Sequence, residues 1–222
     1  MWSPLFDEDD MRSPLLDRGI NPERPVVALT FDDGPSDVTS HILNLLQQYG
    51  GRVSFFVMGK YIKEHRSKIL RAWGMWCDIL CHSWEHDDHT LISPRAVSKQ
   101  IIDTCDSIAS VTGDFLPLYR PPYGNVNKRL TKLTAKLGLS MVNWSLDPKD
   151  WEVLDAEAVS SFILDNVVDG DIILCHDVYK STGDAMSIVI PALISRGFQL
   201  ITVSELLNRR YGTLEFGALY NN

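Results

Sequence analysis

The chain has 222 residues, 45% hydrophobic and 23% charged, a composition typical of a globular protein with one sizeable core rather than of a disordered or collagen-like chain. Its 21 basic and 29 acidic residues give a formal net charge of −8. No basic cluster approaches the density of a phosphate-binding face, so we expect no nucleic-acid partner. No apolar run reaches the roughly 18 residues that a membrane-spanning helix needs, so we expect no membrane span.

The chain begins with MWSPLFDEDDMRSPLLDRG, a polar and acidic stretch without the charged and apolar regions of a signal peptide. We assign residues 1–22 to an N-terminal extension and residues 209–222 to a C-terminal tail. No linker rich in proline, glycine or serine interrupts residues 23–208, so we predict a single domain there.

Seven short apolar segments, rich in β-branched and aromatic residues, predict buried strands. They are residues 26–31, 53–58, 77–81, 116–120, 139–144, 171–175 and 198–203. Amphipathic segments between them predict helices at residues 37–49, 60–73, 95–111, 127–137, 155–167 and 184–196. Apolar strands that alternate with helices indicate a parallel sheet covered on both faces, so we predict an α/β fold, as a closed or partly closed barrel.

The cysteines do not indicate a scaffold of disulfides, because there are four in the whole chain: Cys77, Cys81, Cys105 and Cys175. The first two are spaced loosely like a zinc-binding pair, but no second pair follows them. We therefore expect buried free thiols.

Polar motifs follow five of the predicted strands, where the reactive groups of parallel α/β folds collect. TFDDGP follows the first strand, HSWEH the third, RPPYG the fourth, DPKDW the fifth and HD the sixth. Because the carboxyl ends of parallel strands meet at one rim, we expect these five motifs to form one site.

The first two motifs predict a metal site. Adjacent Asp32 and Asp33 would repel each other unless a cation or an arginine neutralises them, although Asp33-Gly34-Pro35 could also be only a turn. His82 and His86 could face the same way, either from a helix or from a tight loop. With Asp33 from a neighbouring strand end, they supply two nitrogens and one oxygen for a catalytic metal with an open position.

The second motif also matches the HxxEH pattern of a group of zinc peptidases, in which Glu85 would be the general base on a helix. That interpretation needs a helix of about three turns. The preceding CDILC is strand-like, and the following HDDHTLISP is turn-like, with a new helix capped at Ser93. A loop is therefore predicted, which disfavours the peptidase interpretation.

Together the five motifs, in this order and spacing, resemble the signature motifs of the polysaccharide deacetylases of carbohydrate esterase family 4, over residues 24–208. The resemblance implies a distorted (β/α) barrel with about seven parallel strands. It also implies a metal-dependent hydrolase that removes acetyl groups from N-acetylglucosamine-containing polysaccharide, such as chitin, chitooligosaccharide or peptidoglycan. An O-acetyl (xylan) esterase of the same family and a non-catalytic glycan-binding relative remain as alternatives.

The resemblance further implies a partner, a location and a metal site. The partner would be an acetylated polysaccharide or oligosaccharide, and the protein would act as a monomer, secreted or at the cell surface, although the chain shows no signal peptide. One divalent ion, zinc or else cobalt or nickel, would bind Asp33, His82 and His86. Asp32 would be the general base, held ionised and oriented by Arg120.

The remaining motif residues would complete the chemistry. Asp150 should raise the pKa of His176, which would be the general acid. A base that starts deprotonated and an acid that starts protonated predict a bell-shaped pH profile. The backbone N–H of Tyr123 would help to stabilise the oxyanion, and Trp151 and Leu174 would line a small apolar slot for the acetyl methyl group.

Two positions depart from the family pattern. Residues 78–81, Asp-Ile-Leu-Cys, replace a Glu-aliphatic-Gly-Asn run before the first histidine, and the larger side chains could move the loop that aims His82. His89 stands where the family usually has an aliphatic residue. We expect it to point to solvent rather than to compete as a metal ligand.

Overall fold

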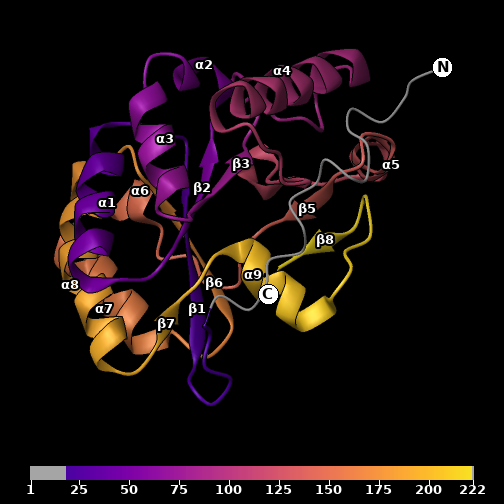
Figure 1. Cartoon of the computed structure of the whole chain (residues 1–222). Coiled ribbons are helices and arrows are strands. Elements are labelled where there is room, and N and C mark those ends of the chain that lie inside the picture. The colour runs from indigo at the N-terminus through magenta and orange to yellow at the C-terminus, as the bar shows by residue number, and fades with distance from the viewer. Residues whose placement is uncertain (1–18, 222) are drawn as a thin grey trace.

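The computed structural model describes residues 19–221, and within them a parallel sheet of eight strands forms the centre of the protein (Figure 1). The strand order is β6-β1-β2-β3-β4-β5-β8, and β7 pairs with β1. The strands are β1 Val26–Asp32, β2 Ser54–Val57, β3 Asp78–Cys81, β4 Leu118–Tyr119, β5 Ser140–Val142, β6 Asp171–His176, β7 Gln199–Leu200 and β8 Leu219–Tyr220. Because every pairing is parallel, the carboxyl ends of β1 to β6 meet at one rim.

The sheet curls until the segment after β5 reaches β6. The backbone N–H of Leu146 donates to the Ile172 carbonyl at 3.1 Å, and the N–H of Leu174 donates to the Leu146 carbonyl at 2.9 Å. At the start of β1, β7 pairs with Val26 and Val27, while β2 pairs with the end of the same strand. The result is a distorted, partly closed barrel, which confirms the predicted α/β fold.

Helices surround the curl, and most of them cover its outside. They are α1 Asp37–Tyr49, α2 Gly59–Ile62, α3 Arg66–Gly74, α4 Pro94–Thr112, the 3₁₀ turn η2 Pro122–Gly124, α5 Lys128–Lys136, α6 Asp150–Val153, α7 Ala156–Asn166, α8 Lys180–Ser195 and α9 Val203–Tyr211. Ser93 caps α4 as predicted, since its hydroxyl accepts the N–H of Ala96 at 3.2 Å. None of the helices within residues 19–221 combines the length and apolar character that crossing a membrane requires.

The structure differs from the sequence prediction in several places. The helix α9 was not predicted, and it begins at Val203, inside the range 198–203 that was predicted as a strand. The helix predicted at 60–73 is two helices, α2 and α3. The four-residue α6 was not predicted, because so short a helix shows no periodicity. The range 209–222, assigned to a tail, contains the end of α9 and the strand β8, which pairs with β5. Of the proposed N-terminal extension, residues 1–18 lie outside the described part of the chain.

The alternation of side chains along β1 shows that the sheet separates two hydrophobic clusters. Val27, Leu29 and Phe31 face outward and pack with apolar residues of α1 and α8. Ala28 belongs to a second cluster inside the curl, which also contains apolar residues of β2 to β6 and α9. Because side chains on a strand alternate with a period of two, Asp32 lies on this inner face at the carboxyl end of the strand. All four cysteines are buried free thiols, as expected.

A buried carboxyl group lies at the other end of the barrel, at the start of β3. Asp78 accepts hydrogen bonds from the Ser54 hydroxyl at 3.1 Å and from the N–H and hydroxyl of Ser204 at 3.0 and 2.9 Å. Burial, and to a smaller extent the nearby charge of Glu205, raises the pKa of Asp78 from 3.8 to about 6. The folded state therefore binds this proton more tightly than the unfolded state does, and the stabilisation it gives is lost as the pH rises through about 6.

We predict that Asp78→Asn flattens this part of the pH dependence. An asparagine can accept the same bonds from Ser54 and from the Ser204 N–H, and its amide can donate to the Ser204 hydroxyl. At about 1.36 kcal/mol per pH unit, the pKa shift of Asp78 corresponds to about 3 kcal/mol of unfolding free energy. The wild type loses this stabilisation between pH 4 and pH 8, and Asp78→Asn does not. Urea denaturation across this range, with the exposed Asp165→Asn as control, measures it. Parallel curves for wild type and Asp78→Asn would contradict the prediction.

Candidate active site

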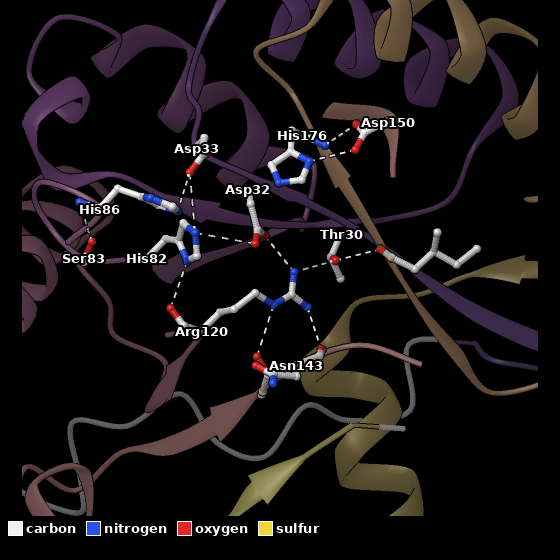
Figure 2. A network of polar contacts seen from close by, with 12 residues as sticks. Thr30, Asp32, Asp33, His82, Ser83, His86, Arg120, Asn143, Asp150 and His176 are labelled. Carbon is white, nitrogen blue, oxygen red and sulfur yellow. Dashed lines mark hydrogen bonds and ion pairs between the residues drawn. The ribbon is translucent and has the colours of Figure 1, made fainter. Parts of the chain in front are cut away.

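Three side chains at the rim form a candidate metal site. The Asp33 Oδ1 atom lies 3.5 Å from Nε2 of His82 and 3.4 Å from Nε2 of His86, and one ligand atom from each residue falls within 4.8 Å of the others. Figure 2 shows both imidazoles turned toward this carboxylate. Asp33 Oδ1 is buried and makes no hydrogen bond with any described residue, an arrangement that a bound cation would satisfy.

Left-handed backbone conformations surround this group. The φ angles are +71° at Asp33, +76° at Ser83, +67° at His86 and +60° at Tyr123. Such conformations cost about 1–3 kcal/mol each for residues other than glycine, and they persist only where the surroundings impose them. The turn at Asp33 ends the strand alternation, so that two consecutive carboxylates reach the same rim.

The two histidines lie on a loop, as predicted, and not on a helix. The intervening Glu85 points to the surface, where it forms an ion pair with Lys60 at 3.2 Å. It is therefore not placed to act as the base of a peptidase.

His82 has the protonation state that a metal ligand needs. Its Nδ1–H donates to the Arg120 carbonyl at 2.9 Å, which leaves the Nε2 lone pair facing Asp33. Burial lowers the pKa of His82 to about 3, so the imidazole stays neutral. Two imidazoles and one carboxylate, with space above them, fit a divalent ion with an open coordination position.

Arg120 occupies the interior of the barrel below this group, fully buried. Its Nη1 atom donates to Asp32 Oδ1 at 2.7 Å and to the Thr30 hydroxyl at 2.8 Å. Nε and Nη2 donate to the carbonyls of Val142 and Asn143 at 3.1 and 2.8 Å (Figure 2). Each of its three guanidinium nitrogens thus has a partner, so the position of the Asp32 carboxylate is fixed from below.

The pKa of Asp32 is raised above 3.8, contrary to the expectation from its arginine partner alone. Burial has the largest effect and raises it, whereas the charge of Arg120 and then that of His176 lower it in part. A carboxylate with a raised pKa is a stronger base, so the raised pKa of Asp32 favours proton abstraction.

His176 and Asp150 form a second pair across the rim. Nδ1 of His176 lies 2.8 Å from Asp150 Oδ1, and the other carboxylate oxygen accepts the His176 backbone N–H at 2.7 Å and the Thr182 hydroxyl at 2.6 Å. Burial opposes a charged imidazole, but the hydrogen bond and charge of Asp150 outweigh it, and the pKa of His176 rises to about 9. This imidazolium therefore persists at neutral pH.

A cleft of about 410 Å³ is lined by the candidate metal group and Asp32 together with His176. Of the residues predicted to shape it, Tyr123 and Trp151 are exposed at the rim, while Leu174 is buried in its wall. The Tyr123 ring contacts the His86 ring edge-on, with 4.6 Å between centroids. The structure thus brings all ten predicted site residues to one cleft or directly below it.

Several residues of the site were missed by the sequence prediction. Thr30 could have been found, because it lies two residues before Asp32 on the same face of β1. Trp144 and Asp147 line the cleft and lie at or near the DPKDW motif, and Tyr179 lies three residues after the sixth strand. Thr182 belongs to no motif and is revealed by its bond to Asp150.

The family model described as polysaccharide deacetylase matches residues 19–142. The chain belongs to the polysaccharide deacetylase family. It is 35% identical over 188 residues to the peptidoglycan-N-acetylmuramic acid deacetylase PdaC of Bacillus subtilis, covering 84% of this chain but 40% of PdaC. It is 32% identical to a chitooligosaccharide deacetylase of Bradyrhizobium, covering 81% of this chain and 90% of that protein.

A solved structure extends the similarity to three dimensions. The family 4 acetyl xylan esterase of Clostridium thermocellum, in complex with a cobalt ion, has a TM-score of 0.81 and 32% identity, over 89% of this chain and 98% of that one. The fold of the deacetylase family is therefore shared along most of this chain.

The departures from the family pattern leave the site geometry intact. Asp78 lies at the far end of β3, Leu80 packs inside the barrel, and Cys81 packs outward beside Tyr119. His89 neither points to solvent nor joins the metal cluster, so that expectation was wrong. It is fully buried, and its Nδ1 lies 2.5 Å from the Tyr119 hydroxyl.

We predict that Asp150→Asn lowers the pKa of His176 from about 9 by about 1–3 pH units, because it removes the opposite charge that favours the imidazolium. NMR titration of the His176 ring in the metal-free protein measures this. Asp184→Asn is the control, since Asp184 pairs with Lys180 on the surface of the following helix. A pKa that stays near 9 in Asp150→Asn would contradict the assignment.

Proposed function

We propose that this chain is a metal-dependent hydrolase that removes acetyl groups from N-acetylglucosamine-containing polysaccharide. The observation that carries the proposal is the cleft itself, in which a three-ligand metal group lies between a buried carboxylate and a protonated imidazole. The chain spans 40% of the length of PdaC.

Zinc is the ion that the ligand set favours, because two imidazole nitrogens and one carboxylate oxygen are its usual donors in hydrolytic sites. Cobalt and nickel accept the same donors. When bound at Asp33, His82 and His86, the ion supplies Lewis-acid polarisation of the acetyl carbonyl and lowers the pKa of water.

Asp32 is placed to act as the general base. Arg120 occupies its Oδ1 atom, while Oδ2 lies 3.6 Å from Nε2 of His82 and faces the cleft. The free oxygen can therefore take the proton of an attacking water. Its raised pKa strengthens it for this task.

His176 is placed to act as the general acid. Asp150 binds Nδ1 and leaves Nε2 for the leaving group, and the pKa of about 9 keeps the proton available at neutral pH. An amine is a poor leaving group until it is protonated, so this proton transfer completes amide cleavage.

The rest of the cleft selects the acyl group. The backbone N–H of Tyr123 would stabilise the oxyanion, and Trp151 and Leu174 would enclose the acetyl methyl group. A pocket of this kind rejects each additional methylene by only about 1–3 kcal/mol.

The substrate we favour is chitin, chitooligosaccharide or peptidoglycan, because relatives that act on such glycans match most of this chain. An enzyme that acts on such glycans would work at or outside the cell surface. We propose that the protein acts as a monomer, because the proposed chemistry needs no residue beyond the ten site residues of this chain. An acetylxylan esterase is the second candidate, favoured by the similarity to the Clostridium enzyme.

Acetate release tests the function. The whole chain is incubated with N-acetylated chitooligosaccharides, peptidoglycan and acetylxylan, with zinc added and after chelation. Zinc-dependent release from the N-acetylated glycans supports the proposal, whereas release from acetylxylan alone favours the esterase. A folded protein that releases no acetate from any substrate would favour a non-catalytic glycan-binding protein.

We predict that Asp32→Asn lowers the turnover number by a factor of about 10² to 10⁴, as expected for loss of a general base, while zinc stays bound. Steady-state kinetics and metal content measure the two effects separately. Asp37→Asn is the matched control, because Asp37 is a surface carboxylate paired with Lys68. Unchanged turnover in Asp32→Asn would remove it from this role.

A further inference from the structure

One side chain outside the five motifs reaches both neighbours of the metal ligand His86. Gln100 lies on α4, and its Oε1 atom accepts the backbone N–H of Glu85 at 2.9 Å. Its Nε2 atom donates to Asp87 Oδ2 at 2.7 Å. A single amide therefore clamps the residues on either side of His86.

The clamp acts where the loop is conformationally costly. His86 has a φ of +67°, a left-handed conformation that is unfavourable for a residue other than glycine. The His86 N–H donates to the Ser83 hydroxyl at 3.0 Å, and the buried Ser83 is tied to α2, because its carbonyl accepts the Gly59 N–H at 3.0 Å. This bond holds His86 through its own N–H, whereas Gln100, which is 9% exposed on a helix packed against β3, holds the residue on either side.

Within the described part of the chain, the other side-chain contacts of this loop do not hold both neighbours of His86. The Arg129 guanidinium binds the carbonyls of His89, Thr90 and Ile92, downstream of the ligand. The Lys60 ion pair with Glu85 is largely exposed, and exposed ion pairs contribute little because water screens their charges. Among the described residues, Gln100 is thus the side chain that ties both neighbours of His86 to a helix.

We propose that Gln100 is a positioning residue that holds His86 in its left-handed conformation, aimed at Asp33, and so sets the metal affinity of the site. The inference rests on the metal site of the proposed function. It assigns to α4, which supplies no residue to the cleft lining, a part in metal binding.

Gln100→Leu tests the proposal, because leucine is close in volume and makes neither hydrogen bond. The zinc dissociation constant of the full chain, measured by competition with a chromophoric chelator, should rise by about 10 to 100-fold, as for other residues that orient metal ligands. The unfolding midpoint of the metal-free protein, measured in parallel, shows whether the variant is folded.

Thr104→Val is the matched control. Thr104 is buried on the same helix one turn later, and its hydroxyl bonds the Gln100 carbonyl within the helix at 2.8 Å. This variant should lower the unfolding midpoint and leave the zinc affinity unchanged. If it weakens zinc binding as much as Gln100→Leu does, the role of Gln100 is merely structural and the proposal is overturned.

A reciprocal exchange keeps the test decisive if Gln100→Leu does not fold. In Gln100→Glu alone, the new carboxylate would repel the Asp87 carboxylate, so zinc binding should weaken. Adding Asp87→Asn restores a donor to that contact and returns the formal charge to that of wild type, so the double variant should regain most of the lost affinity. A double variant no better than Gln100→Glu would overturn the proposal.

The results also separate this inference from the proposed function. If wild type binds zinc but releases no acetate, while Gln100→Leu weakens zinc binding, the positioning role stands and the catalytic proposal fails. If a folded Gln100→Leu binds zinc with wild-type affinity and wild type releases acetate, the function stands and the positioning role is overturned.

Discussion

The buried ion pair between Arg120 and Asp32 is the interaction on which the rest of the site depends. A guanidinium without exposed surface is tolerated only if its charge and its donors are compensated, and here a carboxylate, a hydroxyl and two carbonyls do this. Its planar group also stacks 3.9 Å from the Phe56 ring centroid. Because the Arg120 carbonyl accepts Nδ1–H of His82, one residue orients both the proposed base and a proposed metal ligand.

The barrel uses burial to produce opposite protonation states a short distance apart. Burial lowers the pKa of His82 to about 3, because the charge of Asp33, 3.5 Å away, offsets the burial only in part. The same effect acts on His176, yet Asp150 reverses it and the pKa rises to about 9. A neutral imidazole suits a metal ligand, and a charged imidazole suits a proton donor. The two histidines therefore differ in proposed role because of the groups around them, and not because of their residue type.

Much of the fold and the site could be predicted from the sequence, because their signals are local. Apolar runs of four to seven residues give the strands, and polar motifs directly after them identify the rim. The strand β8 has two residues, too few for any pattern. The pKa of Asp32 depends on how deeply its own carboxylate is buried, and the contacts of His89 and Gln100 depend on packing between segments distant in sequence. Such features follow from the folded barrel and leave no local trace.

The most direct test of the account is a zinc-bound crystal structure with the ion located by anomalous scattering. The account predicts one ion bound by Asp33, His82 and His86, with Asp32 still hydrogen-bonded to Arg120 and not coordinated. An ion held elsewhere, or an Asp32 that leaves the arginine to coordinate the metal, would contradict it.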